Sequence, residues 1–101
     1  MYYQTEKDLI IVKVGTNVLT DISDDREVLN ERAFDRIGRE VRALSDAGMG
    51  IILVSSGAIT AGILGDNRRR RDVDNVYDLQ RYAARGWDRV VQQWKRSIGD
   101  D

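Results

Sequence analysis

The chain has 101 residues, 42% hydrophobic and 33% charged, which is enough for one small domain with one core. Its 16 Lys and Arg residues nearly balance its 17 Asp and Glu residues, and the formal net charge of -1 argues against a global attraction to nucleic acid or an anionic membrane. Because Cys and His are both absent, the chain cannot form disulfides, thiolate nucleophiles, zinc-thiolate sites or imidazole bases.

The sequence predicts neither a membrane-spanning segment nor a secretory signal. The longest apolar stretches fall far short of the roughly 20 residues that span a bilayer. The first residues lack a basic segment leading into an apolar one, as a secretory signal would have. We therefore expect a soluble cytoplasmic protein, treated as one domain over residues 1–101.

The first expected element is a strand at Leu9–Val14. This β-branched run ends at Gly15, and it favours a buried strand of a parallel sheet over an amphipathic edge strand. Residues 15–29 turn polar and acidic after Thr20, so we expect a loop or short excursion there.

A helix is predicted next, with Asn30 as its N-cap and Glu31 in its first turn. Its apolar residues recur at spacings of three and four, which indicates one buried stripe on a helix that ends near Gly48. The stripe consists of Phe34, Ile37, Val41 and Leu44.

A second buried strand is expected at residues 51–54, followed by a strand-to-helix junction at Ser55, Ser56 and Gly57. Strand, helix and strand in this order predict two parallel strands joined by a right-handed crossover, and hence an α/β fold.

The remaining residues predict an exposed loop at 65–75, with four arginines at 68–71, and a final helix that Asp78 could cap. The apolar residues expected to face the core from this helix are Leu79, Tyr82, Ala83, Val90, Val91, Trp94 and Ile98.

Both predicted strands end in small, glycine-containing turns, where ligands gather in an open parallel sheet. Gly15 and Gly57 would let an anion approach the backbone closely, and a helix start would add free amides. Lys13 lies within an apolar run and is costly there unless its ammonium reaches water or an anion. We therefore assign charge stabilisation to Lys13 and ligand orientation to Ser56. The alternative is that Lys13 extends from an edge strand into solvent and that both turns are ordinary connections.

These residues resemble the amino-acid-kinase family. Residues 13–20, which read KVGTNVLT, resemble the Lys-x-Gly-Thr/Ser pattern of its first strand. Residues 54–62, VSSGAITAG, resemble the segment after the second strand in the glutamate 5-kinases of that family. A weaker similarity continues over residues 79–94.

The resemblance implies the start of a three-layer sandwich that is incomplete in this chain, and an ATP-dependent phosphotransferase. Lys13 would contact the ATP phosphates and stabilise the transferred phosphoryl group, while Gly15 and Thr16 would line the same pocket. Ser56 and Gly57 would bind L-glutamate, whose γ-carboxylate receives the phosphoryl group with Mg2+ in the first step of proline synthesis. No metal ligand is assigned within the chain, and a homo-oligomer is possible.

The chain departs from the family pattern at three places, of which the second and third bear on substrate-side geometry and feedback control. Asn17 stands where a small hydroxyl residue is usual, Trp87 where Gln is common, and the arginines at 68–71 where a loop with proline is usual. The family also continues well past Asp101, so the 101 residues are expected to be inactive alone, either as a piece of a longer kinase or as a short relative that lost catalysis.

Two other function classes stay open. One is a non-catalytic module that binds a small anion, or nothing, at the two glycine turns. The other is an RNA-binding protein that uses the arginine run, which is less favoured because no aromatic stacking partners accompany it.

Overall fold

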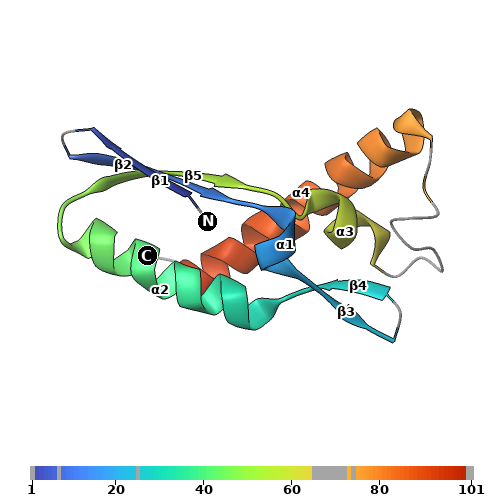
Figure 1. The fold of residues 1–101 in the computed structure, drawn as a ribbon, viewed down its shortest axis with the longest axis horizontal. Helices are drawn as coiled ribbons and strands as arrows, with labels where there is room; N and C mark the ends of the chain where they lie inside the picture. The colour runs from blue at the N-terminus through green and yellow to red at the C-terminus, as the bar shows by residue number, and fades with distance from the viewer. Residues whose placement is uncertain (1, 7, 25, 65–72, 74, 100–101) are drawn as a thin grey trace.

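The computed structural model describes residues 2–6, 8–24, 26–64, 73 and 75–99, which form an α/β fold (Figure 1). The strands are β1 Tyr2–Glu6, β2 Leu9–Val14, β3 Thr20–Ser23, β4 Arg26–Leu29 and β5 Gly50–Ser55. The helices are α1 Thr16–Leu19, α2 Glu31–Asp46, α3 Ala58–Ile63 and α4 Val76–Ile98. Across these residues, no helix is long and apolar enough to cross a membrane.

The main sheet has the strand order β1-β2-β5. β2 and β5 are parallel, in register from the Leu9 and Gly50 pair to the Val14 and Ser55 pair, and α2 connects them. The predicted strand-helix-strand unit is therefore confirmed. The sequence analysis did not predict β1, which pairs antiparallel with the other edge of β2. That pairing satisfies backbone groups of β2 that an edge strand would leave open.

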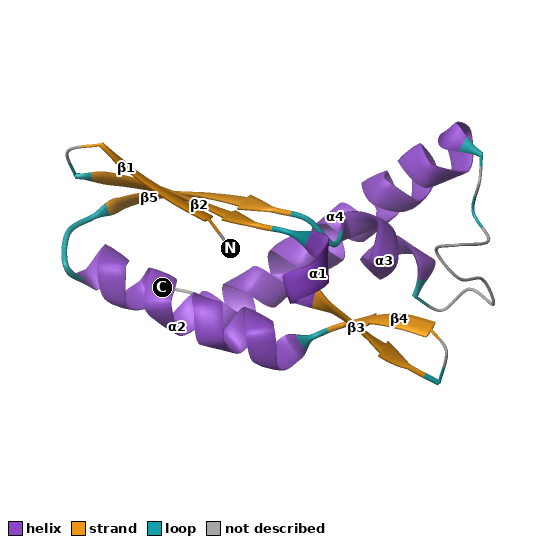
Figure 2. Cartoon of the chain, viewed as in Figure 1, coloured by secondary structure: helices purple, strands orange, loops and turns teal. Residues whose placement is uncertain are grey.

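The core lies between one face of this sheet and the helices α2 and α4, which lie on the same side of it (Figure 2). Side chains alternate along a strand, so every second residue of β2 points into this core. The buried core residues are Ile10, Val12, Val14, Leu19, Phe34, Ile37, Val41, Ala61, Val90 and Trp94.

The opposite face of the sheet is open. Ile52 and Val54 of β5 are 48% and 45% exposed, and Lys13 of β2 is exposed beside Val54. The prediction that both strands are buried is wrong for this face, because no helix of the described residues packs against it. An apolar run in the sequence predicts that a face can be buried, and the tertiary structure decides whether anything covers it.

The segment expected to be a loop at residues 15–29 instead forms α1 and a β3-β4 hairpin. Ser23 pairs with Arg26, so two residues connect the strands. Asp24 has φ +52°, a left-handed conformation that Asp tolerates better than most residues, and short hairpin turns favour it. Two of the acidic residues that indicated a loop, Asp21 and Glu27, therefore lie in the strands of a hairpin.

The ends of α2 agree with the sequence prediction. Asn30 Oδ1 accepts a hydrogen bond from the Ala33 amide at 3.1 Å, which makes Asn30 the N-cap. After the last helical residue, Gly48 adopts φ +92°, and its amide donates to the Ser45 carbonyl. This is the usual glycine ending of an α-helix.

The start of α4 differs from the prediction. Its N-cap is Asn75, whose Oδ1 accepts from the amides of Tyr77 and Asp78, so the proposed cap at Asp78 is wrong. Asp78 lies in the first turn, where a carboxylate faces the positive end of the helix.

The predicted loop at 65–75 lies mostly outside the described residues, and so does the whole arginine run at 68–71. The predicted exposure is wrong at Val73, which is 2% exposed and belongs to a small apolar cluster with Ile63 and Tyr82. An isolated apolar side chain in a polar segment can be buried in this way when a helix surface lies beside it.

α3 packs directly on α4 because two glycines let their backbones meet. A Cβ atom at Gly62 would lie 1.9 Å from the Tyr82 carbonyl oxygen, and one at Gly86 would lie 1.8 Å from the Ala58 carbonyl oxygen. Two arginines of α4 then bond the last carbonyls of α3. Arg85 Nε donates to Gly62 at 2.8 Å, and Arg89 donates to the Ala61 carbonyl at 2.7 Å. The short helix α3 is thus fixed on the long one.

Candidate functional site

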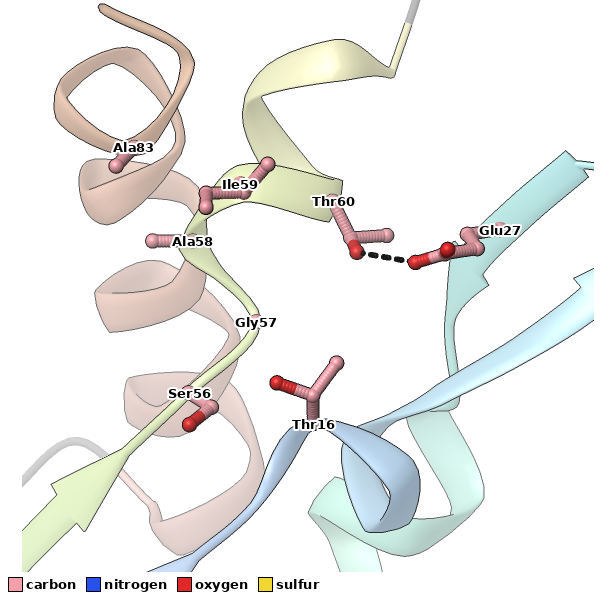
Figure 3. A pocket seen from close by; sticks show the side chains of 8 residues that line it. All are labelled: Thr16, Glu27, Ser56, Gly57, Ala58, Ile59, Thr60 and Ala83. Atoms are coloured by element: carbon pink, nitrogen blue, oxygen red, sulfur yellow. Dashed lines mark hydrogen bonds between the residues drawn. The ribbon is translucent and has the colours of Figure 1, made fainter. Parts of the chain in front are cut away.

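The candidate site is a pocket of about 490 Å³ where β2 and β5 end (Figure 3). In an open sheet, the carboxyl ends of parallel strands are where ligands bind. The pocket is lined by Thr16, Glu27, Ser56, Gly57, Ala58, Ile59, Thr60 and Ala83.

The two strand ends bring their turns together through the sheet ladder. The Ser56 amide donates to the Val14 carbonyl at 3.0 Å, which places Ser56 beside the turn that follows β2. Gly57 then turns the chain into α3 with φ +102°, a conformation that L side chains rarely adopt. In Figure 3 Thr16 stands opposite this Gly57 turn. Thr16 and Ser56 are 40 positions apart in the sequence, and the parallel pairing makes them neighbours.

The sequence-predicted site residues divide into two groups. Thr16, Ser56 and Gly57 line the pocket. Lys13 and Gly15 do not, and both are exposed. The roles assigned to all five residues stay predictions.

Gly15 is not required by the fold. Its φ of -84° is open to any residue, and no heavy atom of the described residues lies within 4 Å of a Cβ atom placed there. A glycine in this position leaves open space above the backbone, which is the property that the predicted phosphate contact needs.

Sequence reasoning missed Glu27, a charged residue of the pocket lining. It projects from β4, and its Oε2 accepts a hydrogen bond of 2.9 Å from the Thr60 hydroxyl of α3. Thr60 is only 3% exposed. Glu27 belonged to a segment expected to be a loop, and no spacing in the sequence related it to Thr60, 33 positions later.

A second hollow of about 330 Å³ adjoins the pocket and shares Thr16 and Glu27 with it. Asp21 of β3 adds a carboxylate to its lining. No group of three or more Asp, Glu, His or Cys residues in the described part of the chain could hold a metal ion. The two hollows therefore join hydroxyls, backbone and two carboxylates, without a preformed metal cage.

Comparison with known proteins extends this description. Residues 8–97 match the model of the amino acid kinase family. The glutamate 5-kinase of Paraburkholderia phymatum is 39% identical over 93 residues, which cover 90% of this chain and 23% of that protein. The Ralstonia nicotianae glutamate 5-kinase is 39% identical over 79 residues, covering 76% of the chain and 20% of the relative.

The glutamate 5-kinase of Pseudomonas putida is 36% identical over 92 residues, covering 89% of the chain and 23% of the relative. The chain thus spans about a fifth of the length of these relatives. The family match includes both strands, the helix between them and the turns that form the pocket. This chain, with its pocket at the ends of two parallel strands, belongs to the amino acid kinase family.

Proposed function

We propose that the chain forms part of the active site of an ATP-dependent phosphotransferase that transfers the γ-phosphoryl group of ATP to the γ-carboxylate of L-glutamate. The observation that supports this best is the pocket that joins Thr16 to Ser56 and Gly57. These residues come from the two turns that resemble the family's motifs. The similarity to glutamate 5-kinases over about nine-tenths of the chain supports the choice of acceptor.

In this proposal Lys13, Gly15 and Thr16 contact the ATP phosphates, and Ser56 and Gly57 bind the glutamate. Phosphoryl transfer depends chiefly on positioning and electrostatics, which a chain without His or Cys can still provide. Because the described residues form no metal cage, Mg2+ would arrive on the nucleotide phosphates. A role in proline synthesis and a cytoplasmic location follow from the resemblance and are part of the proposal.

The alternative of a small-anion module has less support. Of the described residues that line the pocket, Glu27 is the one with a charged side chain, so an inorganic anion there would face a carboxylate without a described Lys or Arg beside it. An amino acid can avoid this repulsion, since its positively charged ammonium group can face the carboxylate.

We also infer that the 101 residues supply only part of a catalytic unit, because they span about a fifth of the length of the relatives. A test compares the isolated chain with a chimera in which it replaces the matching segment of the Pseudomonas putida glutamate 5-kinase. ADP release is followed with ATP, Mg2+ and L-glutamate, and circular dichroism checks that each protein is folded.

We expect glutamate-dependent ADP release from the chimera and none from the isolated chain. A folded chimera without turnover would contradict the proposed phosphotransferase. Turnover by the isolated chain would leave the phosphotransferase standing and overturn the inference that it is only part of the unit.

A further inference from the structure

Glu27 reaches the pocket from the β3-β4 hairpin, outside both glycine turns. Its carboxylate is half-buried, and its Oε2 accepts from the Thr60 hydroxyl at 2.9 Å. Within the described part of the chain, no Lys or Arg forms an ion pair with it. A fixed carboxylate beside an open cavity is suited to receive a donor from a ligand.

The rest of the pocket lining explains which donor would fit. Its other polar side chains are the hydroxyls of Thr16, Ser56 and Thr60, which are neutral. Among the described residues, the lining holds one carboxylate and no cationic side chain, so it favours a positively charged group near Glu27. Charge-assisted hydrogen bonds between ammonium and carboxylate groups are stronger than neutral ones.

We propose that Glu27 binds the ammonium group of an amino-acid acceptor in this pocket, with Thr60 as the positioning residue for its carboxylate. The inference rests on the proposed function, because it names a binding residue for that acceptor. The α-ammonium would lie at Glu27, and the far carboxylate would lie toward the Gly57 turn. In Figure 3 Glu27 and the Gly57 turn lie on different sides of the Thr16 side chain.

An ammonium fits this arrangement better than a metal ion. A dedicated Ca2+ site usually gathers several oxygen ligands, and protein-bound Mg2+ usually relies on substrate phosphates as well. In the part of the chain that the structure describes, the lining of the 490 Å³ pocket offers a single carboxylate. One carboxylate with neighbouring hydroxyls is sufficient for an ammonium, which has three N–H donors.

The test uses two ligands that differ only in the ammonium group. The 15N-labelled 101-residue chain is titrated with L-glutamate and with glutarate, and NMR shifts of the Gly57 and Thr60 amides give both dissociation constants. Variants are Glu27→Gln, Thr60→Val and Thr60→Ser, with Glu31→Gln as a matched control on the exposed first turn of α2.

For the parent chain we expect glutamate to bind about tenfold or more tightly than glutarate, as expected for one hydrogen bond between charged groups. Glu27→Gln should remove most of this preference by weakening glutamate binding without weakening glutarate binding. Glu31→Gln should keep the parent ratio. Thr60→Val should reduce the ratio and Thr60→Ser should restore it, since serine keeps the hydroxyl.

The inference is overturned by an unchanged ratio in Glu27→Gln, by an equal loss for both acids, or by no glutamate binding to the parent chain. A titration with MgCl2 alone tests the metal alternative. If MgCl2 shifts the Gly57 and Thr60 amides, Glu27→Gln abolishes these shifts and the ratio persists, Glu27 binds a metal ion and the inference is overturned. ADP release from the chimera is scored separately. If the ratio collapses but the folded chimera is inactive, the ammonium site stands and the phosphotransferase proposal falls.

Discussion

The indole Nε1 of Trp94 donates a hydrogen bond of 2.9 Å to the Oγ of Ser55, which fastens α4 to the last residue of β5, next to Ser56 in the pocket. The same indole packs at 4.5 Å, centroid to centroid, against the Phe34 ring of α2. One buried side chain therefore joins the two core helices to the strand end that supports the site.

Replacing Trp94 with Phe should destabilise the fold by about 2 kcal/mol, because it removes a hydrogen bond and part of a buried ring system. The Ser55 hydroxyl would lose its donor. Urea unfolding followed by circular dichroism measures the change. Trp87→Phe is the control, since Trp87 is 50% exposed and should cost little. Equal losses for the two variants would contradict the role given to Trp94.

Gly86→Ala should destabilise the fold by about 3 kcal/mol, the upper end of the usual cost of overpacking. The new methyl group would meet backbone atoms of Ala58 and Gly62, which cannot rotate away. Gly15→Ala is the control and should change the free energy of unfolding by less than about 1 kcal/mol, since no atom lies near its Cβ position. A thermally stable Gly86→Ala variant would mean that α3 and α4 are not in direct backbone contact.

Asn30→Ala should cost about 1 kcal/mol of stability, because it removes the side chain that accepts from the Ala33 amide at the start of α2. Asn17→Ala provides a comparison at an exposed asparagine outside that cap. Chemical denaturation of the two variants should separate them clearly. A loss at Asn17 as large as that at Asn30 would argue against the cap as the cause.

Lys13→Ala should lower kcat/KM of the chimera by the equivalent of about 3 to 4 kcal/mol, the scale for one electrostatic donor to a transition state. Folding should change little, because Lys13 is exposed on the open face of β2. Lys95→Ala, an exposed lysine on α4 outside the pocket lining, is the control. Steady-state kinetics within threefold of the parent would contradict the assignment of Lys13.

Some features of this protein were determined by short stretches of sequence. The β-branched run at Leu9–Val14, the three-and-four spacing of Phe34, Ile37 and Val41, and the cap at Asn30 each depend on residues close in the chain. Strand, helix and strand in that order are enough to predict a parallel pair. The meeting of Thr16 with Ser56 and Gly57 at one edge follows from that pairing.

Other features depended on contacts between residues distant in the chain. The polar segment before Asn30 becomes a hairpin, and only its docking beside α3 places Glu27 against Thr60. The packing of the helices decides that one face of β2 and β5 stays exposed. The sequence of an apolar strand does not tell whether one face or both faces of that strand are covered. Local periodicity reports which side of an element can be buried, whereas the partner that meets that side is set by packing across the whole chain.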